Sequence, residues 1–208
     1  MVVLSFKDQI DSTKISLEKP VKSEGKWNIN LKYSEAPLLF KTSRVRFNKE
    51  SSALMFNLQT KSTFVQFLEN LEGIVIDKLH ENSTSLFNGR KFSLEKIQSS
   101  LNRSWDITEN GNVILNTSCK QNVVCTDMFG EKTDFENINN NVSAVLLVKN
   151  ISFTKNLFEI QFEISHLKMS RFEEKRSDNP FDQEIQPAVV ENSTNPTIED
   201  DTGDFFLE

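Results

Sequence analysis

The stretch 38–49 combines positive charge with aromatic rings at the two-residue spacing of a β-strand. On one extended strand, a single side would carry Phe40, Thr42, Arg44 and Arg46. Lys41 would point to the other side with Leu39, Ser43, Val45 and Phe47, and Lys49 would lie in the next turn. Cationic groups neutralise phosphates and flat rings stack on bases. The segment therefore predicts a surface that binds an unpaired nucleic-acid strand.

A second pair of cations follows the turn residues Asn88 and Gly89. The predicted nucleic-acid-binding residues are thus Phe40, Lys41, Arg44, Arg46, Lys49, Arg90 and Lys91. Further rings that could stack on bases are Trp27, Tyr33, Trp105 and Phe153. The alternative stays open that these rings and Phe40 fill the core and that the arginines are ordinary surface charge.

Catalytic motifs are absent from the sequence. It has no glycine-rich phosphate loop, no His-Glu-x-x-His and no Gly-x-Ser-x-Gly. Cys119 and Cys125 are too few for a tetrahedral metal site, and we expect reduced thiols, with a local disulfide as the alternative. Glu159 and Glu163 share a strand face but match no nuclease pattern. We therefore expect no enzyme activity, no cofactor and no metal.

The C-terminal part of the chain carries a strong negative charge. Residues 177–208 hold nine acids and no Lys or Arg, whereas residues 1–176 have a net charge of +3, because the whole chain carries 24 bases and 30 acids. Its proline and polar content predicts a disordered tail. Near its end Asp204 precedes Phe205 and Phe206, and aromatic anchors supply much of the energy of small interfaces. We expect these three residues to bind a partner, although acidic tails can also serve solubility alone.

Apolar periodicity predicts strands before and after one central helix. Residues at three- and four-residue steps predict an amphipathic helix over 63–80, with Thr63 and Gln66 as a possible capping box. A second helix is expected over 93–101. Alternation predicts strands over 2–6, 14–18, 26–33, 38–47 and 53–59 and, after the helices, 105–107, 113–115 and 121–129. Residues 143–153 and 157–169 form the clearest strand pair.

This order of elements favours a mainly β fold with an inserted helix, a small OB-like barrel. A mixed α+β sheet is the alternative. We predict an OB-like nucleic-acid-binding domain over 1–176 and a disordered acidic tail over 177–208. No signal-peptide pattern or membrane-spanning apolar run occurs, so we expect an intracellular protein that does not insert into membranes.

Three blocks of the sequence resemble a known family. They are residues 36–45, the Phe-rich helix from Phe64, and the strand pair 145–153 and 158–162 that leads to Leu167 and Lys168. They resemble OB-fold single-stranded DNA-binding proteins of large nucleocytoplasmic DNA viruses. The acidic tail is separately similar to the tails of bacterial and phage single-stranded DNA-binding proteins. That similarity implies a tail that recruits replication enzymes and competes with DNA.

The leading hypothesis is a non-catalytic protein that binds single-stranded DNA without sequence preference during viral replication or recombination. Its expected partners are single-stranded DNA and, through the tail, replication proteins, with a homo-oligomer possible. The resemblance implies a site of action in the host cytoplasm, a virus factory or the nucleus. One alternative is a protein-interaction adaptor, such as a virion or transcription component. Another is an enzyme, for example a metal-dependent nuclease.

Overall fold

The computed structural model describes residues 3–23, 25–56, 58–154 and 156–170, without the side chains of residues 58–62, 120 and 121. The predicted tail over 177–208 lies outside the described residues, and so do Asp204, Phe205 and Phe206.

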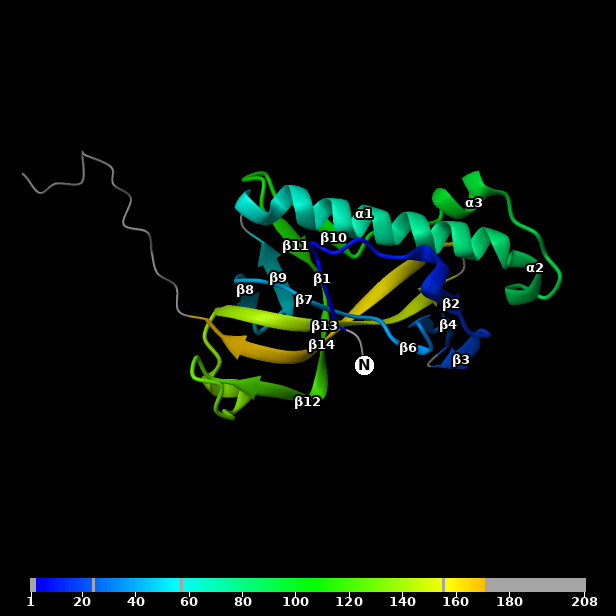
Figure 1. Ribbon diagram of the computed structural model, residues 1–208. Coiled ribbons are helices and arrows are strands. Elements are labelled where there is room, and N and C mark those ends of the chain that lie inside the picture. The colour runs from blue at the N-terminus through cyan, green and yellow to red at the C-terminus, as the bar shows by residue number, and fades with distance from the viewer. Residues whose placement is uncertain (1–2, 24, 57, 155, 171–208) are drawn as a thin grey trace, which may run out of the picture. The chain divides into compact units, whose positions relative to one another are not determined.

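Short strands precede a long helix, and longer strands follow it (Figure 1). The strands before the helix are β1 (Val3–Ser5), β2 (Ile15–Leu17), β3 (Val21–Ser23), β4 (Lys26–Ile29), β5 (Leu31–Tyr33), β6 (Ala36–Pro37), β7 (Leu39–Lys41), β8 (Val45–Asn48) and β9 (Ala53–Phe56). The helices are α1 (Leu58–Glu81), α2 (Ser83–Leu86) and α3 (Leu94–Gln98), with 3-10 turns η1 (Ser12–Lys14) and η2 (Phe135–Asn137). The later strands are β10 (Trp105–Ile107), β11 (Val113–Leu115), β12 (Ser118–Thr126), β13 (Asn141–Phe153) and β14 (Phe158–Met169).

Strand β13 is the centre of the larger sheet in the described part of the chain. It pairs antiparallel with β14 along nearly its whole length, and with β8, β7 and β4 at successive positions. β12 adds to β14 in parallel, β1 adds to β7 in parallel, and β9, β11 and β10 continue the sheet beyond β8. β2, β5 and β6 form a smaller sheet. The predicted fold class, mainly β with an inserted helix, is confirmed.

Helix α1 covers one face of the sheet (Figure 1). The predicted apolar stripe is buried as expected; it consists of Phe64, Phe67, Leu68, Leu71, Val75 and Leu79. Phe64 stacks on Phe56 of β9, with ring centroids 3.6 Å apart. The stripe therefore fixes which face of the sheet is the core.

The helix begins earlier than the sequence predicted. Thr63 lies inside α1, five residues after its start at Leu58, so the predicted capping box at Thr63 and Gln66 is wrong. The apolar stripe marks where burial begins, whereas good helix formers such as Leu and Gln extend the helix ahead of it. The predicted strand over 53–59 correspondingly ends at Phe56.

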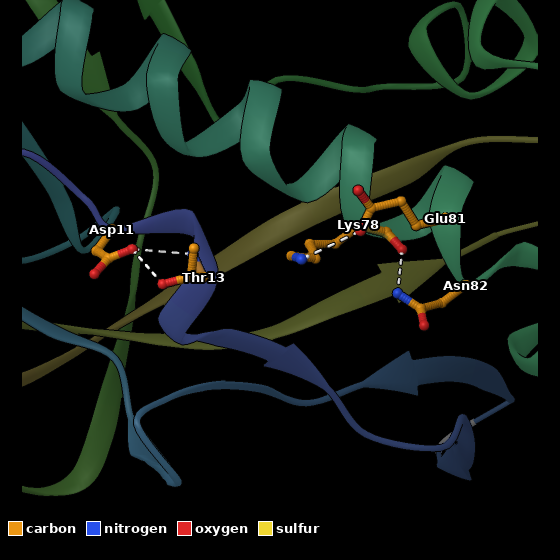
Figure 2. A network of polar contacts seen from close by, with 5 residues as sticks. All are labelled: Asp11, Thr13, Lys78, Glu81 and Asn82. Carbon is orange, nitrogen blue, oxygen red and sulfur yellow. Dashed lines mark hydrogen bonds and ion pairs between the residues drawn. The ribbon is translucent and has the colours of Figure 1, made fainter.

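Local polar contacts stabilise η1 and the C-terminal end of α1 (Figure 2). The Asp11 carboxylate caps η1 by accepting from the Thr13 N–H at 3.1 Å and from its hydroxyl at 2.6 Å. At the C-terminal end of α1, the Asn82 amide donates to the Lys78 carbonyl at 2.8 Å, and the Lys78 ammonium lies 3.2 Å from Glu81. These contacts satisfy backbone groups that a helix end leaves free.

Candidate nucleic-acid interface

The predicted continuous strand over 38–47 is two strands joined by a β-bulge. Between the pairs Lys41–Val145 and Val45–Val142, the first chain advances four residues while β13 advances three. The extra residue falls at Ser43 and Arg44, and it changes which side chains face the core.

Thr42 holds the chain at this bulge. It is fully buried, its N–H donates to the Ala144 carbonyl at 2.8 Å, and its hydroxyl accepts from the Ala144 N–H at 2.9 Å. A side chain thus replaces a backbone acceptor where the regular ladder is interrupted.

Phe40 is a core residue, and its predicted role in stacking on bases is wrong. Its exposed fraction is 0%, and its ring contacts Phe67 of α1 at 5.0 Å and Phe162 of β14 at 5.9 Å between centroids. Because Phe40 faces α1, the neighbouring Lys41 faces the opposite side of the sheet. Phe40 was expected to share one side of the strand with Arg44 and Arg46. Because the bulge adds a residue between them, Phe40 faces the core while Arg44 and Arg46 are exposed.

The bulge brings Lys41 and Arg46 to the same side of the sheet. Val45 and Phe47 are buried on the core side, so Arg46 between them points outward, and both Lys41 and Arg46 are exposed. Sequence alternation had placed Lys41 opposite Arg46. The extra residue reverses that relation.

A second bulge, in β14, turns two more basic side chains outward. Val145 pairs with His166 and Leu146 pairs with Ile164, so Ser165 is the extra residue. The Ser165 hydroxyl donates to the Val145 carbonyl at 3.1 Å and contacts His166 Nδ1 at 3.0 Å. As a result Ile164 and Leu167 are buried while His166 and Lys168 are exposed.

These side chains form one surface, the outer basic face, which consists of Lys41, Arg44, Arg46, His166 and Lys168. One register row crosses five strands and contains Ser5, Lys41, Val145, His166 and Val124. Lys168 pairs with Ser143, and Arg46 pairs with Asn141, at two-residue steps along β13. The four basic residues paired along β13, namely Lys41, Arg46, His166 and Lys168, therefore fall within roughly 13 Å of strand length.

The charges on this surface are not neutralised by the described residues. None of Lys41, Arg44, Arg46 and Lys168 forms an ion pair with another residue in the described ranges. The nearby Lys149 differs, because its ammonium lies 2.8 Å from Glu163. Acids occur in the loop between β12 and β13, namely Asp127, Glu131, Asp134 and Glu136.

Lys49 has a structural contact. It is half-buried, and its ammonium donates to the Glu136 carbonyl at 2.8 Å, which joins the turn after β8 to η2. Phe47 and Phe135 pack beside it with ring centroids 5.9 Å apart. Lys49 therefore borders the outer basic face with one of its donors already used.

Arg90 and Lys91 lie elsewhere, in the exposed loop between α2 and α3. The Arg90 N–H donates to the Phe87 carbonyl at 3.1 Å, and the Phe87 ring packs on Phe153 at the far end of β13. The structure therefore divides the predicted cations between two places.

The other candidate stacking rings also separate. Tyr33 and Trp105 are buried, whereas Phe153 is half-buried and Trp27 is 50% exposed. The Trp105 indole N–H donates to Glu72 Oε1 at 2.7 Å, and the Arg103 guanidinium lies over its ring at 4.7 Å. Burial raises the pKa of Glu72, and the Trp105 and Arg103 contacts partly oppose that rise. Trp105 is thus part of a buried polar network.

His166 and Lys168 were not among the predicted site residues, although the sequence held a signal for them. Apolar residues alternate through Phe158, Ile160, Phe162 and Ile164, and the next buried apolar residue is Leu167. The three-residue step from Ile164 to Leu167, in a series that otherwise has two-residue steps, indicates a bulge. Beyond this bulge, residues 166 and 168 point away from the core.

Metal and membrane features are absent from the described part of the chain. No group of three or more His, Cys, Asp and Glu side chains there could hold a metal ion. Cys119 and Cys125 are free thiols, and burial raises the pKa of Cys125. No described helix is long and apolar enough to cross a membrane.

Comparison with known proteins finds similarity only among solved structures. No family model matches the chain, and no curated protein is similar to it. A single-stranded DNA-binding protein from bacteriophage Enc34, in complex with ssDNA, has 13% identity and a TM-score of 0.39 over 75% of this chain and 96% of that one.

Two further structures of the same phage protein match at a similar level. One has 14% identity over 80% of this chain and 99% of that one, with a TM-score of 0.39. Its C-terminal truncation has 11% identity over 78% and 97% of the two chains, again with a TM-score of 0.39.

Proposed function

We propose that this protein binds single-stranded DNA without sequence preference, with the phosphates lying across the outer basic face. The observation that carries the proposal is the pair of bulges at Ser43–Arg44 and Ser165. They turn Lys41, Arg46, His166 and Lys168 toward the face of the sheet opposite α1. A cation without a carboxylate partner can neutralise a phosphate and release its counterions, which supplies sequence-independent affinity.

The modest positive charge of residues 1–176 limits the affinity of one protomer. A net charge of +3 supports only a few phosphate contacts beyond those that acids offset. We therefore propose cooperative binding or self-association along the strand. A protein of this kind would act in replication or recombination, with its acidic tail recruiting replication proteins and competing with DNA.

The test compares a charge-neutralised outer face with a charge-matched control. The double variant Lys41→Ala/Arg46→Ala should weaken binding to labelled oligo-dT and oligo-dA about equally. Its plot of log affinity against log salt should be shallower by about 0.7 for each phosphate that the variant no longer neutralises. The control variant Lys14→Ala/Lys96→Ala changes η1 and α3 instead, and should keep the wild-type slope. Fluorescence polarisation at several salt concentrations measures both quantities, with duplex DNA as the competitor.

Three results would contradict the proposal. An unchanged salt slope in the folded Lys41→Ala/Arg46→Ala variant would remove the outer basic face from the DNA path. Failure of the wild-type protein to bind any oligonucleotide would favour a protein-interaction adaptor. Cleavage of the oligonucleotide in the presence of a divalent metal would favour an enzyme.

A further inference from the structure

Aromatic residues gather at the far end of the β13–β14 hairpin from the outer basic face. This hairpin-end cluster consists of Trp27, Phe87, Phe92, Phe153 and Phe158. One register row runs from Lys22 on β3 through Trp27 on β4 and Phe153 on β13 to Phe158 on β14. Residues paired in this way point to the same side of the sheet.

Phe153 is the centre of the cluster. Its ring lies 5.7 Å from Phe158 at an interplanar angle of 29° and 5.5 Å from Phe87 at 70°. Phe87 in turn meets Phe92 edge-on at 5.2 Å. The cluster is therefore anchored to the sheet and to the helical segment by ring contacts, which makes it a rigid support.

Trp27 is the exposed member of the cluster. Half of its surface is exposed, and within the described part of the chain its indole has no hydrogen bond and no ring contact. The other tryptophan, Trp105, is buried and hydrogen-bonded to Glu72. A large flat ring that is half exposed on a sheet is suited to stack on another flat group.

Cations occur on the strands and the loop that carry the hairpin-end cluster. Lys22 is its register partner, Lys26 is its neighbour on β4, and both are exposed. Arg90 and Lys91 come from the loop that carries Phe87 and Phe92, and the Arg90 N–H bonds to the Phe87 carbonyl. Glu24, which precedes Gly25 in the sequence, lies outside the described residues. Positive charge beside an exposed ring fits a ligand with a flat base and a phosphate backbone.

We infer that Trp27 stacks on a base of single-stranded DNA, while Lys22, Lys26, Arg90 and Lys91 contact the flanking phosphates. This inference rests on the proposed function and assigns it a second contact region. Val145 and Phe153 are eight residues apart on β13, roughly 26 Å along the strand. The two regions face opposite sides of the sheet, because Lys41 and His166 pair with the outward Val145, whereas Trp27 and Phe153 share the side of the buried Ile29 and Ile151. A bound strand that reaches both regions would pass from one face of the sheet to the other, with phosphate contacts on the outer basic face and base stacking at Trp27.

The test separates base stacking from phosphate contact with two ligands of equal charge. Wild-type protein, Trp27→Ala and Trp27→Phe are titrated with oligo-dT and with an abasic strand of the same length. Trp27→Ala should weaken oligo-dT binding about 5- to 150-fold and leave abasic-strand binding unchanged, because stacking is worth about 1–3 kcal/mol per base. Trp27→Phe should retain most of the affinity. Ile107→Ala, an exposed apolar position on β10, is the matched control and should bind like wild type.

Tryptophan emission provides a readout that does not depend on a folded alanine variant. Oligo-dT should quench the wild-type emission through Trp27, and Trp27→Phe, which keeps only buried Trp105, should lose that quench. Unquenched wild-type emission at saturating oligo-dT would overturn the inference, as would equal losses by Trp27→Ala on both ligands. Those results leave the proposed function standing if the wild-type protein binds. Failure of the wild-type protein to bind either strand overturns both.

Discussion

At the scale of single residues, burial separates side chains of the same type into different roles. Phe40 and Trp105 are in the core, whereas Trp27 is exposed, although all three are large aromatics next to polar residues in the sequence. Arg103 stacks on a tryptophan and contacts Glu72 at 3.2 Å, whereas Arg46 forms no ion pair with a described residue. Composition alone did not distinguish a structural arginine from one available for phosphate.

Glu72 gives a prediction about pH. Its pKa in the folded protein is raised, first by burial, so the folded state holds its proton more tightly than the unfolded chain does. The contribution of Glu72 to stability is therefore best at low pH and declines as pH rises from about 4.5 through the folded pKa. Glu72→Gln keeps an acceptor for Trp105 and removes the titration.

Thermal melts between about pH 4 and pH 7 check this difference. The wild-type midpoint should fall relative to that of Glu72→Gln as pH increases. Glu159→Gln, a half-exposed carboxyl on β14, is the control and should follow the wild-type curve. A constant gap between wild type and Glu72→Gln across this range would show that Glu72 does not couple to stability.

At the scale of elements, the two bulges decide which cations share a face. Each inserts one residue beside β13 and reverses the alternation beyond it. Regular strands in the same places would point Lys41 and Arg46 to opposite sides of the sheet, and would direct His166 and Lys168 toward the core. The outer basic face is thus a property of strand pairing.

Thr42 provides the test of the first bulge. Thr42→Val keeps the shape of the side chain but leaves the buried Ala144 N–H without its acceptor, which should lower the free energy of unfolding by about 1–3 kcal/mol. Thr42→Ser keeps the hydroxyl and should lose less. Urea unfolding of the two variants measures the difference, and a Thr42→Val variant as stable as Thr42→Ser would show that this hydrogen bond does not hold the bulge.

At the scale of the whole chain, the sequence places nine acids after a part of the chain with a net charge of +3. If the tail competes with DNA for the cations, deleting residues 198–208, which removes five acids, should raise the affinity for oligo-dT. The increase should be largest at low salt, because salt screens charge interactions over distance. Polarisation titrations of the full chain and the truncated chain at several salt concentrations measure this effect.

A charge-preserving variant separates competition from recruitment. Phe205→Ala/Phe206→Ala keeps every acid, so its affinity for oligo-dT should equal that of the full chain, while binding of a partner through the aromatic pair should be lost. Truncation that leaves DNA affinity unchanged at every salt concentration would contradict the competition model.

Features that depend on local periodicity and on motifs could be predicted from the amino-acid sequence alone. The stripe from Phe64 to Leu79 predicted the helix and its buried face, and the alternation from Phe158 to Ile164 predicted β14 and its core side. Both predictions were correct because each pattern keeps one period and one buried face over many residues. The charge difference between the two parts of the chain also follows from the sequence alone.

Tertiary structure decided where the candidate site lies. The extra residues near Arg44 and at Ser165 left a trace in the odd spacing of buried apolar residues, but their effect depends on pairing with β13, about 100 residues beyond Thr42 in the sequence. Trp27 is exposed because β4 continues past the part of the sheet that is buried, whereas Ile29 on the same strand is fully buried. Side-chain exposure depends on what packs against each position, and those neighbours come from distant parts of the chain.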